Sequence, residues 1–373
     1  MEMARDKQTD VNTERMVRSV RTVTRKLKAT MIISVLTLSL GVRAAPPTEV
    51  VRVAEIMLLY QRDNGGWPKN YDKDQALTDA ERTGILAQRS RDDTTFDNGA
   101  THSEVRHLAK VYQSTGDERY KEAALKGIEF TLRAQYANGG WPQFYPKAKG
   151  YSRHITFNDN AMVGVMSTLR DIARRAPEFT FVDEALRVRA ASAVAKGIPC
   201  ILKCQIVVDG KKTAWCAQHD ETTLAPAQAR SYELPSLSGS ESVGIVRFLM
   251  GIDRPAPEII EAVQAAIAWF DKAKLKGIRE IRREDPALPK GWDKVVVQDA
   301  SAPPMWARFY EIGSNQPIFC SRDGIPKRTL AEISYERRNG YSWLGYYAAG
   351  LLAEDYPAWQ RKWAPGQDVA RVR

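Results

Sequence analysis

The pentapeptide Asn-Gly-Gly-Trp-Pro at residues 64–68 is followed by Thr-Phe-Asp-Asn-Gly-Ala at 95–100, and this two-part pattern occurs twice. The second copy has Asn-Gly-Gly-Trp-Pro at 138–142 and Thr-Phe-Asn-Asp-Asn-Ala at 156–161, so the pentapeptides start 74 residues apart. An internal repeat indicates a duplicated supersecondary unit that ends in the same turn. We expect the two turns to meet at one end of a repetitive fold, with two carboxylates and two indoles around one cleft.

The segments around these turns have the apolar periodicity of amphipathic helices. β-structure is expected only as a hairpin across residues 204–216, where Asp209-Gly210 favours a two-residue turn, and as a short strand at 294–297. Helix pairs joined by Gly-Gly-Trp turns predict a mainly α fold, a ring that gathers alternate turns at one rim. The expected helices cover residues 50–61, 103–114, 120–134, 161–172, 181–202, 243–250 and 258–275, and a helix-rich stretch covers 341–354.

Residues 1–44 have the pattern of a secretory signal peptide, with a basic segment at 25–28 and a short apolar segment at 31–42. A membrane anchor is the alternative interpretation, although the apolar segment is short for a transmembrane helix. We therefore predict an exported protein, secreted or periplasmic, with no membrane contact after cleavage. One domain is expected at 45–356, and residues 357–373 are expected to form a loose tail.

The chain has a net charge of +10, and the nine basic and four acidic residues of 1–44 account for +5 of it. The remaining +5 includes no run of Lys and Arg interleaved with aromatic residues, which argues against nucleic-acid binding. A mild positive excess suits an extended anionic substrate. The four cysteines could form disulfides in an exported protein or remain buried thiols. The hairpin would bring Cys200 or Cys204 near Cys216.

Asp97 and Asp159 each lie just before an expected helix, where a carboxylate can simply cap the helix N-terminus. Both lie in matched turns beside amide side chains such as Asn98, and this pattern favours a site for a hard cation. Carboxylate and amide oxygens suit Ca²⁺, which accepts six to eight oxygen ligands. The composition is compatible with Mg²⁺ or Mn²⁺ as well.

Four further side chains are candidates for substrate contact or catalysis. The indoles of Trp67 and Trp141 are expected to line a sugar-binding cleft, with packing of the helix ends as the alternative. His154 and His219 could act as bases, or they could be buried hydrogen-bonding residues. The sequence has no Gly-x-Ser-x-Gly elbow, which argues against an acyl-transfer hydrolase.

Three arginines, Arg230, Arg308 and Arg322, are embedded among Ser, Tyr, Phe and Gly and do not follow an alternating charged helix face. That setting favours bidentate recognition of carboxylates, although surface ion pairs are the alternative.

Four further motifs accompany the repeated pair of turns. They are Cys-Ala-Gln-His-Asp at 216–220, the segment from Ala-Arg-Ser-Tyr-Glu at 229–233 to Ser-Gly-Ser-Glu-Ser at 238–242, Phe-Tyr-Glu-Ile-Gly at 309–313 and Arg-Asp-Gly at 322–324. Together these segments resemble the pectate lyases of polysaccharide lyase family 10. The resemblance runs from about residue 55 to residue 351, and the long motif from 216 to 242 is highly specific. Residues 314–316 depart from the family pattern, which affects only local substrate contacts.

The resemblance implies an incomplete (α/α) toroid with a central groove and calcium-dependent β-elimination of α-1,4-polygalacturonate. It implies that the enzyme acts on pectate or oligogalacturonides, and we expect a monomer. By the motif match, Asp97, Asn98 and Asp159 would bind Ca²⁺ and Arg230 would be the base. Substrate contacts are expected from Arg308, Arg322, Trp67, Trp141, His219 and Tyr232.

The chemistry of elimination agrees with this set of residues. The proton at C5 lies next to a uronate carboxylate, and its removal builds negative charge that a cation and guanidinium groups can stabilise. Arginine as a base conflicts with its high reference pKa. Calcium and the two other arginines are expected to lower the pKa of Arg230 by repulsion between like charges, and activity should rise toward alkaline pH. Two alternatives are a glycoside hydrolase that uses Glu233 and Asp220, and a pectin-binding protein without catalytic activity.

Overall fold

The computed structural model describes residues 48–366. The predicted signal peptide at 1–44 lies outside the described residues, as do the last seven residues of the predicted tail. No helix within the described range combines the length and the apolar composition needed to cross a membrane. The described residues belong to one compact unit.

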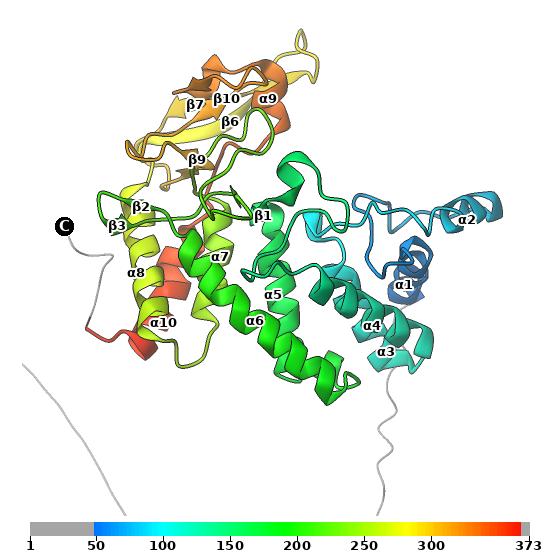
Figure 1. Cartoon of the computed structure of the whole chain (residues 1–373). Coiled ribbons are helices and arrows are strands. Elements are labelled where there is room, and N and C mark those ends of the chain that lie inside the picture. Colours follow the sequence, from blue (N-terminus) through cyan, green and yellow to red (C-terminus); the bar gives the residue numbers. More distant parts are fainter. Residues whose placement is uncertain (1–47, 367–373) are drawn as a thin grey trace, which may run out of the picture. The chain divides into compact units, whose positions relative to one another are not determined.

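Seven helices form at the positions expected from the apolar periodicity (Figure 1). One layer contains four of them in series, because α1 contacts α4, α4 contacts α6, and α6 contacts α8. The second layer contains the other three, with α3 against α5 and α5 against α7. The result is an incomplete α toroid. The helices are α1 (Thr48–Tyr60), α3 (His102–Thr115), α4 (Glu118–Arg133), α5 (Ala161–Ala173), α6 (Glu184–Cys204), α7 (Glu241–Met250) and α8 (Pro257–Lys272).

A buried tryptophan anchors the chain that follows each helix of the first layer, directly in the turn after α1, α4 and α6, and beyond the β6–β7 hairpin after α8. Each indole Nε1–H donates to a carbonyl near the end of the preceding helix, and each indole is buried. Trp215 lies 74 residues after Trp141, as Trp141 does after Trp67, so a third copy of the unit is present without its Asn-Gly-Gly motif. The four bonds are Trp67 to Met57 at 2.7 Å, Trp141 to Thr131 at 2.9 Å, Trp215 to Ile201 at 2.7 Å and Trp306 to Phe270 at 2.8 Å.

Glutamine side chains connect each unit to the next. The Gln61 amide donates to Gly65 O in its own turn and to Ala123 O in α4, at 3.0 and 2.9 Å. Gln135 and Gln205 make equivalent pairs of bonds, to α6 and α8 respectively. Gly139 has φ +94, and a Cβ there would lie 2.1 Å from a carbonyl oxygen of α6. The turn therefore requires glycine, since its backbone packs directly on the neighbouring unit.

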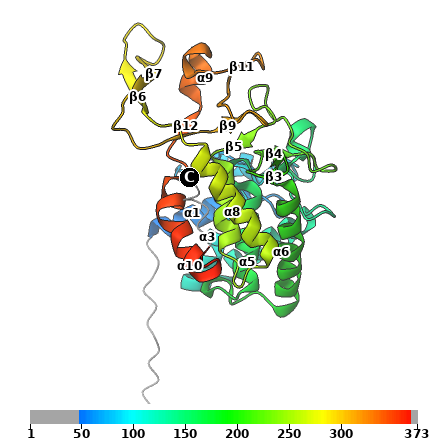
Figure 2. The ribbon, with the colours of Figure 1, turned by 90° about the vertical axis from the view of Figure 1, so that its left-hand side faces the viewer.

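The strands form six two-stranded sheets, most of them very short. The predicted hairpin is confirmed as β2 (Val207–Val208) and β3 (Lys211–Lys212), with Asp209 and Gly210 at positive φ. The predicted strand at 294–297 lies within β7 (Trp292–Gln298), which pairs with β6 (Ile278–Glu284) beyond the ends of the helices (Figure 2). The remaining pairs are β1 (Ile155–Thr156) with β4 (Gln218–His219), β5 (Leu237–Ser238) with β9 (Phe309–Tyr310), β8 (Trp306–Ala307) with β12 (Leu344–Gly345), and β10 (Phe319–Cys320) with β11 (Pro326–Lys327).

The C-terminal prediction is wrong in two respects. The stretch 341–354 contains β12 and a π-helical turn at Leu351–Asp355, and 357–363, expected in the tail, lie in α10 (Tyr356–Trp363). Tyr356 and Trp359 are buried, so packing holds this helix against the fold. Two short helices, α2 (Asp79–Leu86) and α9 (Tyr335–Gly340), were not expected. The four cysteines are free and buried, which agrees with the thiol interpretation.

Candidate active site

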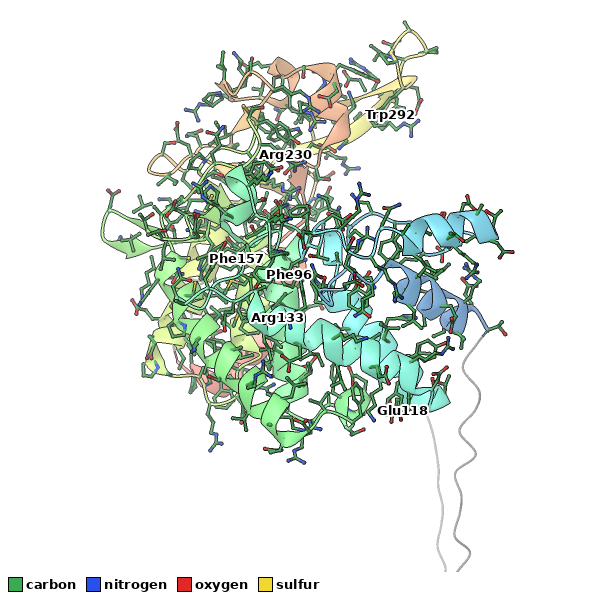
Figure 3. All side chains as sticks on the ribbon, turned by 45° about the vertical axis from the view of Figure 1, so that its right-hand side comes forward. Phe96, Glu118, Arg133, Phe157, Arg230 and Trp292 are labelled. Carbon is green, nitrogen blue, oxygen red and sulfur yellow. The ribbon has the colours of Figure 1, made fainter. Side chains whose placement is uncertain are left out.

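The two repeated turns lie against each other at the start of α3 and α5, as the repeat predicted. One turn is Asp97–Gly99 and the other is Asn158–Asn160; Phe96 and Phe157, which precede them, are labelled in Figure 3. In each turn the second residue, Asn98 or Asp159, has φ near +50°, at 52 and 50°. The repeat therefore aligns the Asp of one turn with the Asn of the other, so the acidic and amide positions are exchanged.

The Asp97 carboxylate is almost fully buried and only partly satisfied. Its Oδ2 accepts from Lys69 Nζ, whereas its Oδ1 has no hydrogen-bond partner among residues 48–366. Asp159 is more exposed and accepts from Asn158 Nδ2 at 2.7 Å. Partial burial raises the pKa of Asp159, and the charges of Asp97 and Glu241 add to this effect against the opposing Arg308. The negative charges of Asp97 and Asp159 therefore repel each other, and the neighbouring lysine and arginine balance them only in part.

A third carboxylate, Glu241, joins this group from the first residue of α7. Glu241 is 5 % exposed and accepts hydrogen bonds from Ser238 Oγ and from the guanidinium of Arg308. Glu241 lies in the Ser-Gly-Ser-Glu-Ser motif at 238–242 but was not predicted as a site residue. The signal was present, because the third tryptophan at the same spacing predicts a third polar turn at the start of a third helix.

The residues of these turns fit a divalent cation. A buried carboxylate oxygen without a partner is costly unless a cation or donor satisfies it. The available donors are carboxylate and amide oxygens, which suit Ca²⁺. Asn98 agrees with this set, since its Nδ2 donates to Asn70 Oδ1 at 2.8 Å and the described part of the chain gives its Oδ1 no hydrogen bond.

A separate group, His154, Asp220 and Glu221, also places possible metal ligands within 4.8 Å of one another. Its carboxylates already have partners. Glu221 is bonded to Arg153 and to His154 Nδ1, and Asp220 Oδ1 accepts the backbone N–H groups of Thr222 and Thr223. These bonds hold the loop after β4, and we assign no metal to it.

The three predicted arginines meet on two tyrosine rings. The Arg230 guanidinium lies 4.9 Å from the centroid of Tyr232 and 5.5 Å from that of Tyr341. Arg322 lies 5.7 Å from the Tyr232 ring, and Arg308 lies 4.6 Å from the Tyr341 ring. Cation–π attraction therefore holds the arginines on one aromatic platform. Tyr341 was missed because its role depends on contacts with residues distant in sequence.

Arg308 links this platform to the carboxylates. Its Nη2 donates to Asn158 Oδ1 at 2.9 Å and to Glu241, and lies 3.7 Å from Asp159 Oδ1. Burial opposes the charge of Arg308, but Glu241, Tyr341 and Asp159 together outweigh burial and raise the pKa of Arg308 above its usual value. Its Nε is buried and has no hydrogen-bond partner in the described part of the chain. Arg322 is exposed and pairs with Glu336.

Glu233 controls the charge state of Arg230. It accepts from Arg230 Nε at 2.7 Å and from Nη2, and it also accepts from the Tyr341 hydroxyl at 2.6 Å. Burial favours the neutral form of Arg230, but the bonds to Glu233 outweigh it and raise the pKa of Arg230. The expectation of a lowered pKa, based on neighbouring positive charges, did not include this carboxylate.

The structure contradicts the expected sugar contacts of Trp67, Trp141 and His219. Both indoles are 0 % exposed and belong to the core, where they fix the helix turns. His219 is also 0 % exposed; its Nε2 accepts from Cys216 N and its Nδ1 donates to Leu224 O. Burial lowers the pKa of His219 to about 4, so it is neutral and structural. Tyr232 is 3 % exposed, so its ring supports the arginines and is not an open sugar surface.

The structure also argues against the glycoside hydrolase alternative, because neither Glu233 nor Asp220 suits the role of the catalytic acid. Burial raises the pKa of Glu233, but Arg230 and Tyr341 outweigh burial and lower it overall. The N–H groups of Thr223 and Thr222 lower the pKa of Asp220. A glycoside hydrolase needs one carboxyl group that stays protonated, and neither residue meets that requirement.

Comparisons with known proteins identify the family to which the chain belongs. The chain is similar to two solved structures of a family 10 polysaccharide lyase from Cellvibrio cellulosa. One, an aspartate-to-alanine variant in complex with trigalacturonic acid, is 38% identical with a TM-score of 0.73 and covers 84% of this chain and 92% of that one. The other is 38% identical with a TM-score of 0.70 and covers 83% and 91%. No curated protein matches. Since the pectic acid lyase family matches residues 61–352, the chain belongs to that family and is a polysaccharide lyase that acts on pectate.

Proposed function

We propose that this lyase cleaves α-1,4-polygalacturonate by calcium-assisted β-elimination. The observation that carries the proposal is an Asp97 oxygen that no residue of 48–366 bonds, beside Asp159 and Glu241 and next to a group of arginines. The binding of trigalacturonic acid by a related lyase supports the substrate class. Polygalacturonate is a large polymer that does not cross membranes, so the enzyme must meet it outside the cell membrane. The proposal therefore includes export of the enzyme, directed by residues 1–44.

The bound substrate would expose its acidic C5 proton between the carboxylates and the arginines. Asp97, Asp159 and Asn98 would hold Ca²⁺, which supplies positive charge for the uronate carboxylate whose C5 proton is removed. Arg308, fixed by Glu241 and Asn158, would add a guanidinium to the same region, and the exposed Arg322 would bind the carboxylate of a neighbouring sugar. These charges act most strongly on the anion that forms as the proton leaves.

Arg230 would take the C5 proton on a guanidine nitrogen. The electrons of the C–H bond form a double bond between C4 and C5, and the C4–oxygen bond breaks to release the preceding sugar, whose oxygen takes a proton from water. Because Glu233 raises the pKa of Arg230, the neutral base is scarce near neutral pH. We therefore expect turnover to rise steadily toward alkaline pH.

The test is incubation of the purified enzyme with polygalacturonate, with Ca²⁺ or with excess EGTA. We expect ultraviolet absorbance from the conjugated double bond to appear only with the cation. Equal rates after exhaustive EGTA treatment would contradict the cation site, and reducing ends without absorbance would indicate a hydrolase. Binding without any product would leave a pectin-binding protein.

A further inference from the structure

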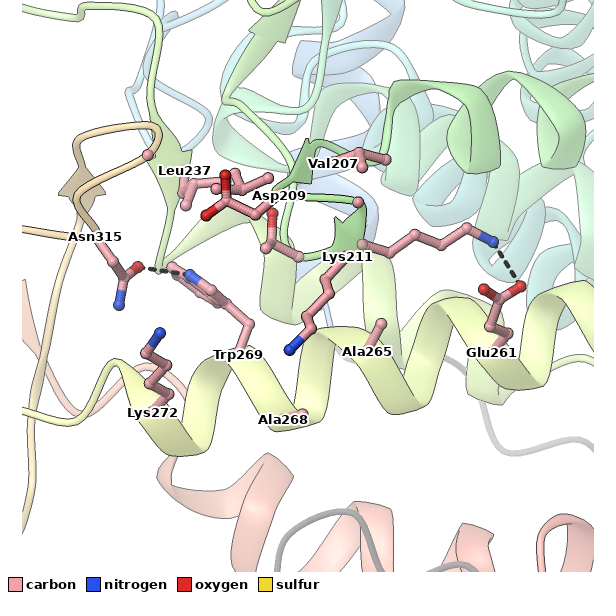
Figure 4. Close-up of a pocket in the computed structure, with 15 residues that line it drawn as sticks. Val207, Asp209, Lys211, Leu237, Glu261, Ala265, Ala268, Trp269, Lys272 and Asn315 are labelled. Atoms are coloured by element: carbon pink, nitrogen blue, oxygen red, sulfur yellow. Dashed lines mark hydrogen bonds and ion pairs between the residues drawn. The ribbon is translucent and has the colours of Figure 1, made fainter. Parts of the chain in front are cut away.

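A cavity of about 800 Å³ lies between the β2–β3 hairpin, α8 and the loop at residues 313–315 (Figure 4). It is separate from the active site, as adjacent residues of β5 show. Leu237 lines the cavity, whereas the Oγ of Ser238 donates to Glu241. Successive residues of a strand point to opposite faces. The cavity and the active site therefore lie on opposite faces of the β5–β9 pair.

The cavity carries positive charge that the described residues do not neutralise. Lys211 of the hairpin and Lys272 of α8 both line it, and the structure gives neither one an ion-pair partner in the described range. Figure 4 shows the two side chains reaching into the space from these two elements. Lys212 is bonded to Glu261 at 2.7 Å, so those two charges cancel. Asp209 remains as the single other acid, which leaves a net positive lining.

Apolar surface accompanies these ammonium groups. Ala265 and Ala268 form a flat part of α8, and Val207 at the hairpin is 57 % exposed. Asn315 is held in place because its Oδ1 accepts the indole N–H of Trp269 at 2.7 Å. Because this bond fixes the orientation of the Asn315 amide, its N–H groups can donate to a ligand in the cavity. A ligand that suits this lining has an apolar face, hydroxyl groups and a carboxylate.

We propose that this cavity is a second, non-catalytic binding site for an acidic oligosaccharide, with Lys211 and Lys272 binding uronate carboxylates. The inference rests on the proposed function, because a polyuronate substrate supplies such segments beyond those held in the active site. Two sites on one polymer raise the effective concentration of the second contact, so even weak ion pairs increase retention on the polymer.

The test compares Lys211→Gln/Lys272→Gln with the matched control Lys110→Gln/Lys196→Gln, which removes the same charge from exposed lysines elsewhere. We expect the cavity variant to lose retardation in gels containing polygalacturonate and to show a KM for the polymer raised about three- to tenfold. Its kcat/KM on trigalacturonate should stay at the wild-type value. In gels with fully methyl-esterified pectin, the variant and the control should migrate alike, because the carboxylates are masked.

The outcomes separate the two proposals. If the cavity variant and the control are retarded equally in polygalacturonate gels, the second site is refuted even where lyase activity is normal. If the wild type forms no unsaturated product, the proposed function fails, and the gels still decide the cavity. If the cavity variant loses as much retardation in esterified pectin as it does in polygalacturonate, the cavity does not recognise carboxylates and the inference is wrong.

Discussion

Replacement of Lys69 by methionine should tighten the binding of Ca²⁺. Lys69 follows the first Asn-Gly-Gly-Trp-Pro motif, and in the second copy the same position is Gln143. Its Nζ is bonded to Asp97 Oδ2 and lies 5.5 Å from the centroid of Phe144. The chain's own ammonium group is therefore bonded to the carboxylate that we propose as a calcium ligand. A bound Ca²⁺ and the Lys69 ammonium would therefore both contact the Asp97 carboxylate and repel each other.

The size of the effect follows from Coulomb's law. A unit charge and a divalent charge about 5 Å apart repel by about 2–3 kcal/mol at an effective dielectric constant of about 40–80. The Lys69 side chain is 33 % exposed, so the ammonium can swing toward water and relieve part of this repulsion. A net change of about 1–2 kcal/mol remains, which corresponds to a roughly five- to thirtyfold lower Kd.

Isothermal titration with Ca²⁺ measures this change without substrate. Lys73→Met is the matched control, because Lys73 bonds Glu104 at 2.6 Å and is 34 % exposed but does not touch Asp97. In EGTA, Lys69→Met should also unfold more easily, by about 1–3 kcal/mol, since Asp97 loses its hydrogen-bond donor. A Kd that is unchanged or higher in Lys69→Met would refute the competition between the ammonium and the cation.

Three further predictions concern the base, the buried histidine and the core tryptophan. Arg230→Lys should lower kcat on polygalacturonate by about 10²–10⁴-fold while calorimetry shows nearly unchanged binding of trigalacturonic acid, and an active variant would refute the base. His219, with its pKa lowered to about 4, binds a proton more readily when unfolded, so about 3 kcal/mol of stability should be lost as pH falls from about 6.5 to 4. Urea unfolding of His219→Gln should show a shallower loss over that range; an identical slope would contradict the assignment. Trp141→Phe leaves Thr131 O unpaired and should cost about 1–3 kcal/mol in urea unfolding, whereas a raised KM at unchanged stability would restore the sugar-contact role.

The helices were predictable because apolar periodicity and the glycine turns are local signals. The spacing of two Asn-Gly-Gly-Trp-Pro motifs also predicted that Asp97 and Asp159 would meet, and the contact between their turns confirms this. The strand β6 gave no such signal, since its only apolar residues, Ile278 and Ile281, are three residues apart and do not follow the two-residue period of a strand. Pairing with β7 stabilises it. The helix α10 was missed because the burial of its two aromatics, Tyr356 and Trp359, depends on tertiary packing that local periodicity does not reveal.

The site was predicted less completely than the fold because its charges depend on partners brought from distant segments. Glu233 lies three residues from Arg230, and from the sequence it was a candidate catalytic carboxyl group for the glycoside hydrolase alternative. Only the structure shows that it bonds Arg230 and Tyr341 together and raises the pKa of the proposed base. Arg308 and Glu241, 67 residues apart, are likewise paired only in three dimensions.

Trp67 and Trp141 recur in the repeat and were predicted to contact sugar, whereas the structure buries both in the core. A residue that recurs at the same place in every unit serves what every unit needs, and here each indole fixes a helix turn. The active site needs only one copy of each group, so its residues occur where the units differ. Asp97 replaces the Asn158 of the next turn, Asp159 replaces Asn98, and Lys69 stands where the second unit has Gln143. If Asn158 were also an aspartate, the Arg308 bond to its amide oxygen would become a further ion pair and reduce the positive charge available to substrate. Differences between the units therefore identify the catalytic surface better than the shared residues do.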